Sequence, residues 1–255
     1  MTVEKKAVAD GVVRISAGDP QREVLSTGQL VLVLSDEPVR LELTVPSGPV
    51  AVKDVLPIFQ GLSSLMAERA TARIEAEGKA VSCRAGCGAC CRQLVPISAP
   101  EARALADLVA AMPEPRQSQV RQRFDDALTA LSAAGVLDRQ SQPVDGNVAE
   151  LGLDYFQLRI ACPFLEDEAC SIHRDRPLSC REYLVASPAE HCETPSANTI
   201  DRLKLEGHPS LTLLKAEATA GWMPLVLALG FSEQAPPPER DRTGPEILRD
   251  LIGRL

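Results

Sequence analysis

Residues 83–91 read CRAGCGACC and place four cysteines within nine positions. Free cysteine buries well as a small hydrophobe, but packing alone does not require four thiols so close together. Gly86 and Gly88 allow the backbone to bend tightly, so sulfurs two to four positions apart can converge on one centre. The stretch therefore indicates a metal-binding loop.

A second group of cysteines is spaced more widely and has two histidines nearby. It comprises Cys162, Cys170, Cys180 and Cys192, with His173 and His191. Closing the loop of roughly 70 residues between the groups costs on the order of 4 kcal/mol, whereas a structural zinc site contributes about 10–16 kcal/mol. One site can therefore span both groups. Thiolates select zinc, copper(I) or iron–sulfur clusters over calcium and magnesium.

The composition is that of a folded, acidic, globular protein. The chain has 255 residues, 45% of them apolar, and its 27 Lys and Arg against 35 Asp and Glu give a net charge of -8. This balance, with only 3% aromatic residues, argues against nucleic acid binding, which usually needs a basic face and, for single strands, aromatic stacking platforms. No apolar run typical of a signal peptide follows the N-terminus, and the apolar stretch 222–231 is too short to span a bilayer. We therefore expect a cytoplasmic protein without membrane or nucleic acid partners, whose thiols stay reduced.

Residues 1–49 are expected to form a small β unit. Apolar and polar residues alternate over 39–45, and 30–34 is the predicted hairpin partner across a turn at 35–38, with a third strand at 12–15. From residue 55 the period changes, because apolar residues recur every three or four positions as far as Ile74. This pattern predicts a long helix with Asp54 as its N-cap and Gly78 as its stop.

Further helices are expected beyond the first cysteines. Ser98 and Glu101 match a capping box that starts one helix, and a second helix has an apolar side over 120–131 and ends near Gly135. There follow a polar loop up to 147, short elements around 162–192, a helix near 211–220, a core element at 222–231, a Pro-rich linker at 235–238 and a helix over 245–252. The predicted fold class is a mostly helical α+β protein. Its predicted parts are the β unit (1–49), a helical cysteine-cluster metal-binding domain (50–234), and a linker with a C-terminal helix (235–255).

Four blocks in this sequence resemble the YkgJ-type cysteine-cluster family, which is described as zinc- or iron-chelating. The blocks are residues 83–91, Cys162-Pro163-Phe164-Leu165, Cys170-Ser171-Ile172-His173 and the run from Arg176 to Tyr183. The resemblance implies a metal-binding set of seven thiolates: Cys83, Cys87, Cys90, Cys91, Cys162, Cys170 and Cys180. It leaves the roles of Cys192, His173 and His191 open.

The adjacent residues Cys90 and Cys91 are expected to point in different directions and to serve two sites. One arrangement assigns Cys83, Cys87 and Cys90 to an open site and the other four thiolates of the set to a closed one. The region 144–192 has little periodic apolar pattern, so its folding is expected to depend on the metal.

Three functions are consistent with these features, and no catalytic residue can be named from known motifs. The first is an intracellular metalloprotein that binds zinc or an iron–sulfur centre through clustered thiolates. The same family pattern occurs in flagellin lysine N-methylases, which implies as an alternative an iron–sulfur- and S-adenosylmethionine-dependent protein lysine N-methyltransferase. The spacing of Cys83, Cys87 and Cys90 is also that of radical S-adenosylmethionine enzymes, but no β/α repeat predicts their barrel. A second alternative is a thiol redox sensor, because arginines near the cysteines favour thiolate.

Overall fold

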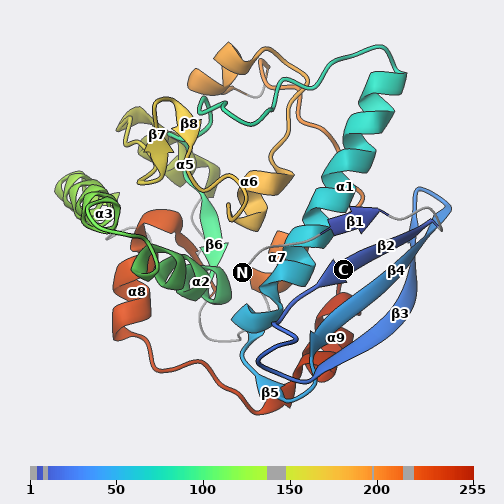
Figure 1. The fold of residues 1–255 in the computed structure, drawn as a ribbon. Coiled ribbons are helices and arrows are strands. Elements are labelled where there is room, and N and C mark those ends of the chain that lie inside the picture. Colours follow the sequence, from blue (N-terminus) through green and yellow to red (C-terminus); the bar gives the residue numbers. More distant parts are fainter. Residues whose placement is uncertain (1–4, 8–10, 137–147, 197, 215–220) are drawn as a thin grey trace.

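The computed structural model describes residues 5–7, 11–136, 148–196, 198–214 and 221–255, and it confirms a mostly helical α+β fold (Figure 1). The strands are β1 (Lys5–Ala7), β2 (Val12–Ser16), β3 (Leu25–Leu34), β4 (Glu37–Pro46), β5 (Pro49–Val50), β6 (Pro96–Ser98), β7 (Leu165–Glu166), β8 (Ala169–Cys170), β9 (Trp222–Pro224) and β10 (Arg242–Thr243). The α-helices are α1 (Leu56–Ala76), α2 (Ala99–Ala110), α3 (Arg116–Ala133), α5 (Val148–Gln157), α6 (Leu178–Glu182), α7 (Pro209–Leu214), α8 (Ala228–Gln234) and α9 (Gly244–Ile252). The 3-10 helices are η1 (Val52–Val55), η2 (Ala189–Glu193) and η3 (Leu225–Leu227). None of the helices in the described ranges combines the length and apolarity that crossing a bilayer requires.

The N-terminal β unit is a four-stranded sheet in the order β1-β2-β4-β3. The predicted hairpin is confirmed, since β3 and β4 pair antiparallel, and the third strand β2 pairs parallel with β4. The turn is shorter than predicted. Only Ser35 and Asp36 lie outside the strands, and both have positive φ (47° and 64°). A two-residue hairpin turn needs these angles to match the twist of its two strands.

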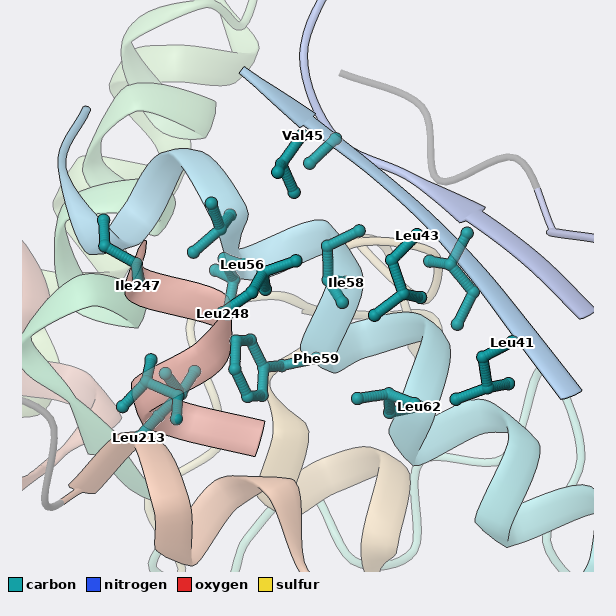
Figure 2. Close-up of a cluster of buried hydrophobic side chains, with 14 of the residues drawn as sticks. Leu41, Leu43, Val45, Leu56, Ile58, Phe59, Leu62, Leu213, Ile247 and Leu248 are labelled. Atoms are coloured by element: carbon teal, nitrogen blue, oxygen red, sulfur yellow. The ribbon is translucent and has the colours of Figure 1, made fainter. Parts of the chain in front are cut away.

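Helix α1 packs across this sheet and forms the first core (Figure 2). Leu41 and Leu43 of β4 face Ile58 and Leu62 of α1, and all four side chains are buried, while Phe59 on the other side of α1 points toward Leu213. Ile247 of α9 is in the same cluster, so one core joins residues from the β unit, the long helix and the C-terminal helix. The domain boundaries at 49/50 and 234/235 stay a prediction, and this shared core crosses both.

The long helix is confirmed, but its predicted N-cap is wrong. Asp54 lies inside η1, where its carboxylate accepts a hydrogen bond from the Ala51 N–H at 3.0 Å, and Val55 is the N-cap of α1. The cap is displaced because a short 3-10 turn precedes the helix. Gly78, at φ +79°, follows the last turn and confirms the predicted stop.

A second core is formed by residues of α2, α3, α8, β6 and β9, which gather away from the four-stranded sheet (Figure 1). The Ser98–Glu101 capping box is confirmed at the start of α2, and α3 ends before Gly135, which has φ +65°. The apolar stretch 222–231 is a core element, as predicted: β9 pairs with β6, and η3 and α8 follow. The predicted C-terminal helix is α9. The polar loop at 137–147 and the end of the helix expected near 211–220 lie outside the described residues, while α7 covers its beginning.

Candidate metal centre

The first cysteine loop is bent by its two glycines. Gly86 has φ +89°, which glycine adopts without strain, and the Cys91 N–H donates to the Gly88 carbonyl at 2.9 Å to close a tight turn. A Cβ atom on Gly88 would lie 2.4 Å from the Glu168 carbonyl oxygen, so only glycine permits the β7–β8 hairpin to approach this closely. Arg92 fastens the same hairpin through two hydrogen bonds to the Glu168 carboxylate, at 2.9 and 2.6 Å.

The fold brings the two groups of cysteines into contact. The Cys162 N–H donates to the Cys91 carbonyl at 2.7 Å, which joins the two groups directly. The Cys83 Sγ accepts a hydrogen bond from the Val185 N–H at 3.4 Å, just beyond the second group's Cys180. Sequence positions far apart therefore meet, as a shared site requires.

A cavity of about 580 Å³ lies where the groups meet. Six of the seven predicted ligands line it: Cys87, Cys90, Cys91, Cys162, Cys170 and Cys180. Cys83 is not among the residues that line the cavity, and its sulfur accepts the hydrogen bond from Val185 instead. As the side chains stand, the described part of the chain contains no group of three or more His, Cys, Asp or Glu arranged to hold a metal ion.

Cys90 and Cys91 do not point apart, and that expectation is wrong. Their thiols share a hydrogen bond, which lowers the pKa of Cys90 to about 7, and the positive charge of Arg176 adds to this effect. The same bond raises the pKa of Cys91, and burial raises it further. Cys90 is therefore the thiol of the pair that ionises, and Cys91 keeps its proton and donates it.

The cysteines of the second group are protonated in the absence of a cation. Burial raises the pKa of Cys162 to about 12, and it also raises the pKa values of Cys170 and Cys180. Metal binding at these thiols must release protons. It is favourable only where the free energy gained from the metal–sulfur bonds exceeds the free energy needed to deprotonate the thiols.

Arg176 supplies positive charge to the cavity. Burial raises the pKa values of Cys83, Cys170 and Cys180, and the charge of Arg176 opposes this rise, while at Cys90 it adds to the lowering of the pKa. Its Nε atom is buried and has no hydrogen-bond partner among the residues that the structure describes. This guanidinium beside the thiols supplies the counter-charge that a thiolate centre needs, so the donor set and its surroundings fit zinc or iron.

The three residues whose roles the sequence left open do not line the cavity. Cys192 is 3% exposed, and burial raises its pKa to about 11, with further contributions from Cys90, Cys83 and Cys87. The His191 Nδ1 atom lies 2.9 Å from the Thr199 carbonyl oxygen, and burial lowers the pKa of His173.

The histidine that does line the cavity, His208, was missed by the sequence analysis. It lies 3.2 Å from the carboxylate of Glu182, which also lines the cavity. No motif in the sequence connects these two residues, because their proximity depends on how α6 and α7 pack.

Comparison with known proteins identifies the cysteine-rich part of the chain. Residues 82–201 match the family model CxxCxxCC, described as a putative zinc- or iron-chelating domain. The match confirms the resemblance to a cysteine-cluster family and supports metal binding through the cysteines. The matched range contains all eight cysteines and ends before His208. No curated protein and no solved structure matches the chain.

Proposed function

We propose that this chain, whose residues 82–201 form a domain of the CxxCxxCC family, is an intracellular metalloprotein that binds zinc or an iron–sulfur centre. The proposed ligands are the thiolates of Cys83, Cys87, Cys90, Cys91, Cys162, Cys170 and Cys180. The observation that carries the proposal is that six of these thiols, from four separate stretches of chain, line one cavity beside Arg176. A cytoplasmic location would keep the thiols reduced and free to bind metal.

The cavity is larger than a single bound ion requires. In a single four-thiolate site the sulfurs lie only about 2.3 Å from zinc, whereas the cavity has a volume of about 580 Å³. Charge interactions link Cys91 with Cys162 and Cys170, and they link Cys83 with Cys87. Cys90 also interacts with Cys91, Cys162, Cys170 and Cys180, so these interactions join all the thiols, and the division into an open site and a closed site stays a prediction.

Metal content of protein purified without oxygen tests this function. Iron with sulfide and a brown colour, or stoichiometric zinc in colourless protein, is the expected result, and absence of both after reconstitution would overturn the proposal. Cys170→Ser should lose metal because it removes a thiol of the cavity wall. Cys192→Ala is the matched control, since it removes a buried thiol outside that wall and should retain the metal.

The S-adenosylmethionine-dependent protein lysine N-methyltransferase is a second candidate, favoured by the rest of the cavity wall. Leu94, Leu211, Leu214 and Leu225 give that wall an apolar character, and the volume lies in the range of about 300–1,000 Å³ typical of small-molecule pockets. S-adenosylmethionine should then bind the anaerobic protein and perturb its absorption spectrum. Colourless zinc protein without affinity for S-adenosylmethionine removes this candidate.

A thiol redox sensor is a further candidate, favoured by the hydrogen bond between the thiols of Cys90 and Cys91. A sensor should purify without stoichiometric metal and form a reversible disulfide on mild oxidation. Retention of full metal after the same oxidation, with no disulfide in peptide mass spectra, argues against it.

A further inference from the structure

Glu182, at the end of α6, is a buried carboxylate with four hydrogen-bond donors. It is 5% exposed. Its Oε1 atom accepts from the Ser63 Oγ and the Ser210 N–H, both at 2.9 Å, and its Oε2 atom accepts from the Ser210 Oγ at 2.5 Å. The fourth donor is His208 Nδ1, 3.2 Å from Oε2. The carboxylate is thereby fixed between α1 and α7.

This contact determines the state of the imidazole ring. A carboxylate only accepts hydrogen bonds, so the Nδ1 atom of His208 must carry the proton, and in the neutral ring Nε2 is then the acceptor. His208 lines the 580 Å³ cavity, and its side chain is 42% exposed. Within the described residues, Nε2 has no hydrogen-bond partner. A proton acceptor with a fixed orientation therefore faces the space beside the thiols.

The pairing is more than a way to satisfy a buried carboxylate. Ser63 and Ser210 already give Glu182 three hydrogen bonds, two on Oε1 and one on Oε2. The bond from His208 adds what the serines do not, namely an oriented imidazole with one free nitrogen. A base that is itself held by a third group is the recurring arrangement for proton transfer in enzyme sites.

We propose that His208, positioned by Glu182, is the proton acceptor for a small organic molecule that binds in the cavity beside the thiol centre. The proposal rests on the proposed function only in placing the metal at that centre. The molecule has an apolar body, which contacts Leu211, Leu214 and Leu225, and a head group with an N–H, O–H or S–H bond. When that bond breaks, its electron pair stays on the molecule, and the proton forms the Nε2–H bond. The resulting imidazolium is stabilised by the adjacent carboxylate of Glu182.

The role of Glu182 is tested by the tautomer of His208 in the full-length protein with its metal. Long-range ¹H–¹⁵N correlation spectra of histidine-labelled protein should show Nδ1–H and unprotonated Nε2 at His208. Glu182→Gln should lower the fraction of this tautomer. Ser63→Ala is the matched control, because it removes one hydrogen bond from Glu182 without touching His208 and should leave the tautomer unchanged. An Nε2–H tautomer in the unmodified protein overturns the proposal.

The role of His208 is tested with three probes: hexylamine, 1-hexanol and 1-hexanethiol. At least one should bind and shift the His208 Nε2 resonance, and His208→Gln should weaken its binding about ten- to hundredfold, as expected for loss of a hydrogen bond to a charged or polarised group. If no probe shifts the resonance, or if the variant binds as well as the unmodified protein, the proposal is wrong. Metal content is measured in the same samples. His208→Gln should retain all of it, and a loss would make His208 a metal ligand instead. Metal-free unmodified protein would contradict the proposed function while leaving the tautomer result valid.

Discussion

Replacing Glu101 with alanine should destabilise the protein strongly, because this carboxylate joins two helices in a buried position. Glu101 is 2% exposed, and its Oε2 accepts from the Ser98 N–H at 2.9 Å and the Ser98 Oγ at 2.8 Å. Its Oε1 accepts from the Leu178 N–H at 2.8 Å, at the start of the helix that carries Cys180. Alanine leaves two buried N–H groups without an acceptor, at about 1–3 kcal/mol each. The free energy of unfolding should therefore fall by about 2–6 kcal/mol, a large share of the usual 5–15 kcal/mol.

Urea unfolding of the full-length protein, followed by circular dichroism, measures this loss as a lower midpoint at unchanged slope. Glu246→Ala is the matched control. Glu246 makes the same capping box with Thr243, through hydrogen bonds of 2.8 and 2.7 Å, but on the exposed surface, where water replaces the lost partner. The reasoning is refuted if Glu101→Ala loses no more stability than the control. Metal content of Glu101→Ala should also fall, because α6 starts at the bond that is lost.

Three further outcomes follow from the cysteine centre. Gly88→Ala should displace the β7–β8 hairpin and reduce the metal content. Gly230→Ala should do neither, because a Cβ atom at that position has no other atom within 4 Å. Equal metal content in both variants would contradict the steric argument. Chelation should make the chain sensitive to limited proteolysis first between Cys91 and Cys192, and equal resistance with and without metal counts against a structural role for it. In metal-free protein, alkylation of Cys90 should reach half its maximal rate near pH 7, because its pKa is lowered to about 7. An alkylation midpoint near pH 9 would contradict the lowered pKa. Because the pKa of Cys90 is lower in the folded protein than in the unfolded chain, its thiolate contributes to stability above about pH 9, and this contribution is lost as the pH falls through 7.

Elements governed by nearby residues were predictable from the sequence. The alternation over 39–45, the Ser98–Glu101 capping box and the glycine stop at Gly78 each depend on contacts within a few positions, and all three occur in the structure. The wrong N-cap at Asp54 has a related cause. Its carboxylate does bind a backbone N–H at a helix start, but the helix is the short η1 rather than α1. Periodicity indicates that a helix exists more reliably than it locates the first turn.

The site was predictable only as far as its thiols, because clustered cysteines are visible in the sequence and distant packing is not. Histidines near the cysteines in sequence, His173 and His191, were the natural candidates, and neither lines the cavity. His208 reaches the wall because Glu182, 26 positions earlier, meets it across α6 and α7. Two polar residues 26 positions apart produce no hydrophobic or polar period in the sequence from which their contact could be predicted.

The two halves of the cavity come from different parts of the chain. All the thiols and Arg176 lie within the family match at 82–201, whereas His208 and the leucines of α7 lie after it, and Ser63, which helps to hold Glu182, lies before it. The long helix α1 thus connects the N-terminal core to the cavity wall, since it packs on the sheet and also donates to Glu182. Under the two proposals above, the residues of the family match hold the metal, and the flanking segments contact the molecule that binds beside it. Substitutions in α7 should accordingly change ligand binding without changing metal content.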